Sequence, residues 1–259
     1  MKSKLVMVWL ILATIVTGCA SVEKTSRQSQ VASVMAYLFP NSGKVPPPST
    51  QVAELKVPFR IGVAFVPDNS NPEFRLPEKE RISLATQVRE AFSGYPFVSE
   101  LVAIPSSYLG PGGGFENLGQ VASLFKLDVV ALISFDQVQN AGATGWSFLY
   151  WTGLGAYVID GDQFDILTAV ETSVFDVNSR QLLLRAGGLS SIKGTATMVG
   201  FSEQARLART QSFEKAIQDM ISNLHSEVKQ FRQSAAKNPN VRLILPPGYN
   251  SNATREVVK

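Results

Sequence analysis

The N-terminal segment constrains the chain most, because its pattern is that of a processed leader and not of a folded element. Lys2 and Lys4 give it a positively charged start, and residues 5–16 form an almost wholly apolar stretch. That stretch has the length of a secretory signal core and falls short of the roughly 20 residues that a membrane-spanning helix needs. We therefore expect residues 1–18 to be a signal peptide and leave them out of the predicted fold.

The apolar stretch ends in Val16-Thr17-Gly18-Cys19, and Cys19 is the only cysteine in the sequence. This tetrapeptide resembles the lipobox of bacterial lipoproteins, in which an aliphatic residue and two small residues precede the cysteine. The resemblance implies cleavage between Gly18 and Cys19 and attachment of a diacylglycerol to the Cys19 sulfur. A plain signal peptide with an incidental cysteine is the alternative. We disfavour it because a lone cysteine can form no internal disulfide and because Cys19 stands where a lipobox requires it.

The resemblance also predicts where the protein resides. Two or three acyl chains, palmitate among them, anchor a protein stably, since each buried methylene contributes about 0.8 kcal/mol. An aspartate after the cysteine favours retention in the inner membrane in lipoproteins of this type, and Ala20 takes that place here. In a Gram-negative host we therefore expect a lipid-anchored protein of the cell envelope, on the periplasmic face of the outer membrane.

Composition excludes several classes of partner and site. The chain has 259 residues, of which 45% are hydrophobic and 17% charged, as in a globular protein with a substantial core. The chain carries 24 basic and 21 acidic residues, and loss of Lys2 and Lys4 with the signal leaves the two nearly balanced. We therefore expect no nucleic-acid partner. A single cysteine also excludes a disulfide framework and a cysteine-type zinc site.

Residues 19–52 are predicted to be the lipid anchor, a tether and a linker. Residues 21–30 are polar and small, as in a flexible tether, and residues 31–40 are an apolar island that suits a short helix or strand. Residues 41–50 contain Pro46-Pro47-Pro48, which favours a stiff, extended linker. We expect the folded body to begin near Ala53.

Residues 53–234 are predicted to form one globular domain in which strands and helices alternate. The first half predicts strands at 59–66, 97–104 and 127–138, with a helix beginning at Pro77 and another at 117–125. The second half predicts a β-hairpin of 164–177 with 181–186 and then a long helix whose apolar residues recur from Phe213 to Phe231. The expected class is α/β or α+β, a three-layer domain with a mixed sheet. Residues 235–259 are expected to be a polar C-terminal tail.

Several phrases of the mature chain occur together. They are VMAYLFP (34–40), GVAFVPD (62–68), YWT (150–152) with GAY (155–157), VFDV (174–177), SR (179–180) and LLLRA (182–186). With the lipobox, they resemble the rhombotarget lipoproteins, a bacterial family of unknown function. The family name implies a link with rhombosortase, which trims tails made of a Gly-Gly pair, an apolar helix and basic residues. The end of this chain, from Pro246-Pro247-Gly248-Tyr249 onward, departs from that pattern.

Candidate chemistry is sparse. His225 is the only histidine, and the sequence has no G-x-S-x-G motif to supply a nucleophile for it. We expect it to be a solvated histidine on the last helix. Asp160, Asp162 and Asp165 are dense enough to suggest a calcium site, but their spacing does not match an EF-hand. A solvated turn is the preferred interpretation, so we expect no metal and no cofactor.

The most unusual segment is residues 145–159, which concentrate aromatic side chains between glycines. The candidate interface residues are Trp146, Phe148, Tyr150, Trp151 and Tyr157. One interpretation is an internal strand or core loop. The other is an aromatic flap that contacts a membrane, a neighbouring subunit or a partner, because Trp and Tyr combine an apolar body with a polar tip.

These observations predict a function only in outline. The first hypothesis is a non-enzymatic accessory or scaffold lipoprotein that binds an envelope protein or polymer. The second is an oligomeric secretion or pore component in which the aromatic segments of several copies come together. The third is an envelope hydrolase, which ranks last because histidine is scarce and no catalytic motif is present.

Overall fold

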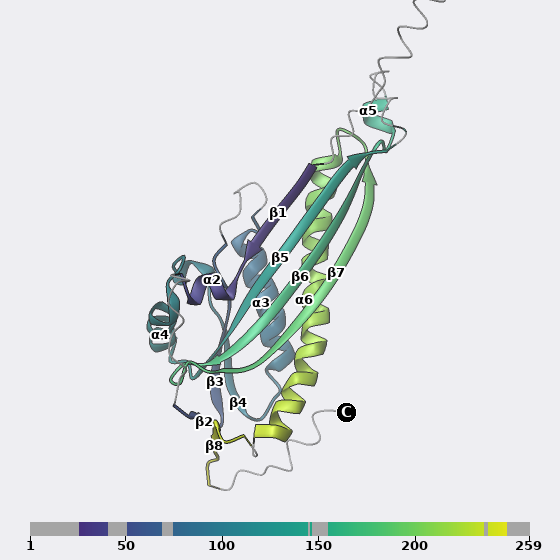
Figure 1. Ribbon diagram of the computed structural model, residues 1–259. Coiled ribbons are helices and arrows are strands. Elements are labelled where there is room, and N and C mark those ends of the chain that lie inside the picture. Colours follow the sequence, from purple (N-terminus) through teal and green to yellow (C-terminus); the bar gives the residue numbers. More distant parts are fainter. Residues whose placement is uncertain are drawn as a thin grey trace, which may run out of the picture.

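The computed structural model confirms the expected class, with a mixed six-stranded sheet covered by helices and a separate two-stranded sheet (Figure 1). The structure describes residues 26–40, 51–68, 75–144, 146, 155–235 and 238–247. Within them, the strand order of the large sheet is β4-β3-β5-β6-β7, with β1 added beside β5.

The strand–helix half of the domain follows the sequence prediction closely. It consists of β3 (Phe59–Phe65), α3 (Glu78–Phe92), β4 (Val98–Ala103), α4 (Gly114–Phe125) and β5 (Val129–Ala143). Strand β3 pairs in parallel with both β4 and β5. The chain therefore crosses the sheet twice in opposite directions, and right-handed crossovers place α3 and α4 on opposite faces.

The second half is a long hairpin and a longer helix. Strands β6 (Asp162–Asp176) and β7 (Leu182–Ala196) continue the sheet antiparallel to β5, and α6 (Phe201–Ala235) lies along it. At about 1.5 Å per residue the 35 residues of α6 span about 50 Å. Strands of 15 residues at about 3.3 Å each have the same length. Helix and hairpin therefore cover each other from end to end.

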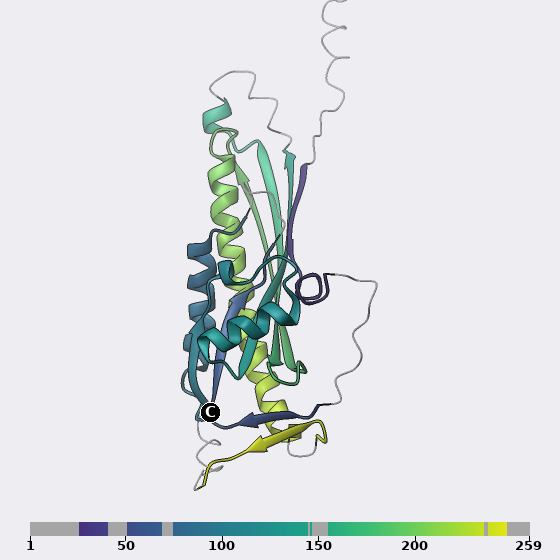
Figure 2. The ribbon, with the colours of Figure 1, turned by 90° about the vertical axis from the view of Figure 1, so that its left-hand side faces the viewer.

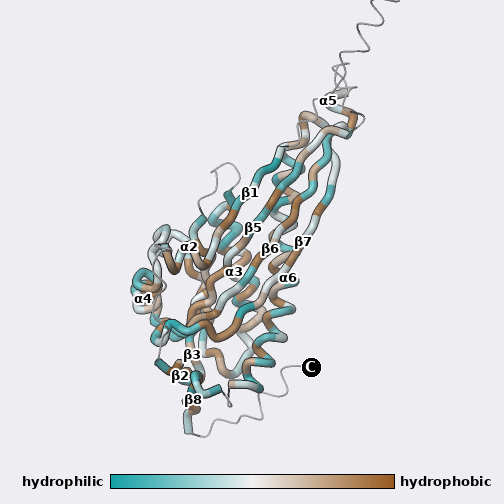
Figure 3. Tube along the Cα trace, in the orientation of Figure 1, coloured by the Kyte–Doolittle hydropathy of each residue, from teal (hydrophilic) through white to brown (hydrophobic). Residues whose placement is uncertain are grey.

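Three layers result from this arrangement. Helices α3 and α6 lie together on one face of the sheet (Figure 2). Phe213 of α6 makes an edge-to-face contact with Phe135 there, with ring centroids 5.1 Å apart. Helix α4 packs on the other face, where Phe115 contacts Phe175. The main core lies in the lower part of the sheet, around fully buried side chains such as Phe65, and Figure 3 shows the apolar residues concentrated there.

The sheet begins earlier than the sequence suggested. Strand β1 (Ser26–Ala32) pairs antiparallel with β5 and leads into α2 (Val34–Leu38), so the expected polar tether through residue 30 is wrong from Ser26 onward. Gln30 is buried there and donates from Nε2 to the Gln137 side-chain oxygen at 2.7 Å. A polar strand of this kind shows no hydrophobic alternation, which is why its sequence did not indicate a strand, although Oε1 of Gln28 and Oε1 of Gln30 are buried without a hydrogen-bond partner.

The C-terminal region is also more ordered than predicted. Strand β8 (Val241–Ile244) pairs in parallel with β2 (Ala53–Lys56), so a polar tail from residue 235 is wrong for residues 238–247. Leu55 is almost completely buried, and the amide of Val57 donates to the Ile244 carbonyl at 2.9 Å. This small sheet closes the lower end of the molecule (Figure 1).

Candidate functional site

One end of the long sheet, here called the distal end, brings together the start of the described domain and two chain reversals. Ser26 at the beginning of β1 lies opposite Ala141 of β5. Ala143, Asp162 and Ala196 form one row across β5, β6 and β7. The short helix α5 (Gly155–Val158) lies at this same end (Figure 1). The start of β1 therefore lies at the same end of the molecule as α5.

Exposed apolar side chains gather at the distal end. They are Trp146 (63% exposed), Tyr157 (68%), Val158 (77%), Met198 (58%) and Val199 (57%). We call these five residues the apolar tip. Tyr157 and Val158 are the two most exposed large hydrophobic residues of the described chain. Single exposed apolar side chains need no explanation, but a group of them at one place indicates a contact surface.

The apolar tip stands on an ordered base. The Thr144 amide donates to the Gly161 carbonyl at 2.5 Å, and the Trp146 amide donates to Oγ1 of Thr144 at 3.3 Å. A small core lies beneath, where the rings of Phe164 and Phe201 meet edge to face with centroids 6.0 Å apart. The five tip side chains take no part in this core and are all more than half exposed.

The structure places some of the predicted interface residues and not others. Trp146 and Tyr157 lie on the surface, which favours the interface interpretation over a core loop for these two. The other predicted residues, Gly18, Cys19, Phe148, Tyr150 and Trp151, lie outside the described residues. Sequence reasoning missed Met198 and Val199, because only the pairing of β6 with β7 brings their turn to the same end.

The three aspartates of the calcium hypothesis are not gathered into a site. Asp162 and Asp165 are three residues apart on β6, so their side chains leave opposite faces of the sheet. Oδ2 of Asp165 lies 3.7 Å from the ammonium group of Lys193. Within the described ranges, acidic, histidine and cysteine side chains form no group of three or more that could hold a metal ion.

His225 is not the solvated residue that the sequence suggested. It lies half-buried between α6 and α3, stacked on Phe92 with ring centroids 4.4 Å apart. Its Nδ1 is 2.6 Å from the hydroxyl of Tyr95. Burial lowers the pKa of His225 and raises the pKa of Tyr95, so this hydrogen bond joins a neutral imidazole to a neutral phenol. The imidazole is thus engaged by a phenol, whereas a triad would engage it with a carboxylate and a hydroxyl nucleophile.

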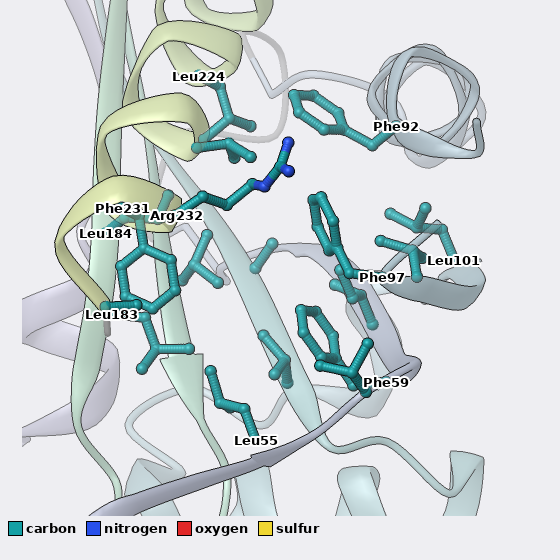
Figure 4. Close-up of a pocket in the computed structure, with 18 of the residues that line it drawn as sticks. Leu55, Phe59, Phe92, Phe97, Leu101, Leu183, Leu184, Leu224, Phe231 and Arg232 are labelled. Carbon is teal, nitrogen blue, oxygen red and sulfur yellow. The ribbon is translucent and has the colours of Figure 1, made fainter. Parts of the chain in front are cut away.

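An apolar cavity of about 250 Å³, here called the basal cavity, lies at the end opposite the apolar tip (Figure 4). Its lining includes Leu55 under the small sheet and the rings of Phe59, Phe97 and Phe231. Arg232 also lines it, with the guanidinium carbon 5.7 Å from the Phe97 ring centroid. The lining comes from segments far apart in the sequence, which is why no local pattern indicated a cavity. Such a space has room for a small apolar group.

Among the described helices, none is both long enough and apolar enough to cross a membrane.

Comparison with protein-family models finds no match, and comparison with curated proteins finds none. Among solved structures, the chain is similar to a neuraminyllactose-binding hemagglutinin homolog from Helicobacter pylori. The identity is 11% and the TM-score 0.39, over 75% of this chain and 95% of that one. It is also similar to two PelC dodecamer structures from Paraburkholderia phytofirmans. One has 11% identity and a TM-score of 0.28 over 64% of this chain and 96% of that one. The other has 9% identity and a TM-score of 0.26 over 74% and 98%. At these TM-scores the likeness carries no argument about function.

Proposed function

We propose that this protein is an outer-membrane lipoprotein on the periplasmic face that serves as a non-enzymatic accessory or scaffold of the cell envelope. The observation that carries the proposal is Val16-Thr17-Gly18-Cys19, a lipobox-like sequence around the only cysteine. The start of the domain supports it. Ser26 already belongs to the sheet, and the seven steps from Cys19 to Ser26 reach at most about 25 Å. An anchor at Cys19 would therefore hold the domain close to the membrane.

The use of the reactive side chains favours binding over catalysis. Glu78 accepts from the amide of Ser106 at 2.7 Å and so fixes the chain after β4. Asp176 accepts from the amide of Ser179 at 2.7 Å inside the hairpin turn. His225 is bonded to Tyr95. Each of these groups stabilises a turn or a helix contact, and the two carboxylates also accept from the hydroxyls of Ser106 and Ser179 within the same contacts. None of the three groups lines the basal cavity.

The anchor is tested by Cys19→Ser, with Thr17→Ser as the matched control because it keeps a small residue before an intact cysteine. We expect the wild type and the control to incorporate labelled palmitate and to fractionate with membranes. Cys19→Ser should lose the label and accumulate as uncleaved precursor. Label that persists in Cys19→Ser would overturn the anchor.

The accessory role is tested by crosslinking the lipidated protein in its own membranes and measuring both its partners and its native size. A monomeric bait crosslinked to one distinct envelope protein supports the scaffold. A large homo-oligomer supports the second candidate, a secretion or pore component built from copies of this chain.

One structural observation bears on that second candidate. Strand β7 lies at the edge of the sheet, where unpaired backbone groups could recruit a strand from another copy. Helix α6 covers part of this edge. Asp219 Oδ2 accepts from the Leu189 amide at 2.9 Å, and Asn223 Nδ2 donates to the Gly187 carbonyl at 2.8 Å. Pairing of copies through the middle of β7 would have to break both bonds, which favours the accessory role.

A further inference from the structure

We propose that the apolar tip is a second membrane contact, which inserts into the headgroup region of the same bilayer that holds the lipid on Cys19. This inference rests on the proposed anchor. Its partner is a lipid surface, and its residues are Trp146, Tyr157, Val158, Met198 and Val199.

The apolar tip lies at the end of the domain to which the anchor leads. The chain between Cys19 and Ser26 is short enough to keep Ser26 within about 25 Å of the lipidated residue. Ser26 lies opposite Ala141, two residues before the end of β5, so the tip lies at the end of the sheet to which the anchor leads. Leu124 of α4 is also exposed but lies towards the opposite end, because α4 leads directly into the start of β5 (Figure 1). Only one end of the molecule can meet the membrane in this way.

The side chains of the apolar tip are of the kinds that membrane–water interfaces favour. Trp and Tyr concentrate at membrane–water interfaces, where the ring contacts acyl chains and the N–H or O–H reaches water. Val158, Met198 and Val199 add aliphatic surface around them. The five side chains come from two separate turns, one between β5 and β6 and one between β7 and α6. The described tip residues of both turns are apolar and exposed, and both turns follow strands that end in the same row of the sheet.

The charged residues around the apolar tip indicate which kind of lipid surface it can contact. Around the tip, Glu203 pairs with Arg206 at 2.8 Å and Asp165 with Lys193 at 3.7 Å. Two further cations near this end, Arg27 of β1 and Arg209 of α6, are balanced in number by two further acids, Asp160 and Asp162. This end therefore offers no basic patch for anionic headgroups among the residues that the structure describes. We expect insertion to depend on apolar burial, to occur in zwitterionic bilayers, and to change little with ionic strength.

The tryptophans make a direct test possible, because the chain has only Trp9, Trp146 and Trp151. Under the proposed anchor Trp9 leaves with the signal peptide, so a chain that carries Trp151→Phe keeps Trp146 as the one fluorophore of its lipidated form. It is purified in lipidated form and reconstituted into phosphatidylcholine vesicles with or without bromine on the acyl chains. Bromine quenches tryptophan only near contact, so an inserted Trp146 should lose about half of its emission in brominated vesicles.

Two matched variants separate insertion from mere proximity. In the first, Trp146 and Trp151 are both changed to Phe and Leu124→Trp places the fluorophore on α4, where we expect no quenching. In the second, Val158→Asp is added to the Trp146 reporter. Val158 is 77% exposed, so this change should leave the fold intact while reducing the quenching severalfold.

Each outcome decides between the proposals. A chain that does not float with the vesicles overturns both the anchor and the tip. A chain that floats but shows no more quenching than the Leu124→Trp control overturns the tip and leaves the anchor standing. A blue shift of Trp146 emission without bromine quenching also overturns the tip as a lipid contact, because protein and not lipid then covers it.

Discussion

Gly188 shows how one residue fixes the distance between the hairpin and the long helix. It lies on β7 and faces α6, where an added Cβ would lie 2.2 Å from the Ala216 carbonyl oxygen and 2.4 Å from the Met220 amide nitrogen. Both neighbours are backbone atoms of one helix, so neither can move aside alone. We expect Gly188→Ala to lower the free energy of unfolding by about 3 kcal/mol, at the upper end of overpacking effects.

Urea unfolding of Gly188→Ala beside Gly187→Ala checks this expectation. The two glycines are adjacent, but a Cβ on Gly187 would meet the Val170 carbonyl at 3.6 Å, an ordinary contact. Gly187→Ala should therefore change stability little. Equal losses in the two variants would show that a general intolerance of the strand, and not the helix contact, is responsible.

Tyr37 couples the stability of the N-terminal region to pH. Its hydroxyl donates to Oδ1 of Asn117 at 3.0 Å, and the same oxygen accepts from the Gly110 amide at 3.0 Å. Burial raises the pKa of Tyr37 to about 12, above the usual value near 10. The folded state therefore holds this proton more tightly than the unfolded state. The resulting stability is fully present below about pH 10 and is lost as the pH rises towards 12.

Tyr37→Phe isolates this contribution, because phenylalanine cannot ionise. At neutral pH we expect the variant to be less stable by about 1 kcal/mol for the lost hydrogen bond. The gap between wild type and variant should narrow between about pH 10 and 12. It is measured as the difference in free energy of unfolding at each pH. A constant gap across that range would contradict the role assigned to burial.

The residues that sequence periodicity misplaced are those that depend on tertiary partners. The helical spacing of Ile82, Ala85, Val88 and Phe92 on α3 indicates one apolar face, yet Ile82 is 38% exposed and Arg81 only 5%. Arg81 is buried because it pairs with Asp68, donates to the Leu76 carbonyl at 2.9 Å and lies over the Phe135 ring. None of these partners is within one helical turn, so a helical pattern could not predict them.

At the scale of elements, α6 both packs on the sheet and shields its edge. Asp219→Ala would remove the acceptor for the Leu189 amide on β7. We expect a loss of about 1 kcal/mol and faster hydrogen exchange at that amide, since one partly exposed hydrogen bond is lost. Glu214→Ala is the control, because it removes an exposed acidic residue from the same helix. If hydrogen exchange at the Leu189 amide rises equally in both variants, the cause is the loss of a negative charge from α6 and not the loss of the hydrogen bond to Asp219.

Most of the elements could be predicted, and the exceptions have physical causes. Strands β3 and β5 and helix α4 follow from local alternation or helical periodicity. Strand β7 extends ten residues beyond its predicted end at Ala186, because its continuation contains glycines and polar residues that lower strand propensity. Helix α6 starts twelve residues before Phe213, because its first turns bury small side chains such as Ala205 and Ala208 that give a weak hydrophobic pattern.

At the scale of the whole molecule, the apolar tip and the basal cavity lie at opposite ends of one elongated domain. Aromatic composition singled out Trp146 and Tyr157 but left open whether they lie in the core or on the surface. That Met198 and Val199 join them, and that Ser26 enters beside them, depends on strand register across β1, β5, β6 and β7. The basal cavity was beyond sequence reasoning for the same reason. An elongated domain with an apolar, anchored end would hold its other end away from the bilayer by about the 50 Å length of its strands.

The small sheet of β2 and β8 is what closes that other end. Leu243 and Leu245 line the basal cavity from the C-terminal side, and Leu55 lines it from β2. A chain that stops after Ala235 lacks β8 and should uncover the cavity. We expect its free energy of unfolding to fall by about 2 kcal/mol, because the burial of two half-exposed leucines is lost, and its binding of the apolar dye ANS to rise.

A chain that stops after Pro247 keeps β8 and is the matched control. Its stability and its dye binding are expected to equal those of the full chain. Equal dye binding by the two truncated chains would contradict a role of β8 in closing the cavity. Residues 238–247 would then behave as the polar tail that the sequence predicts.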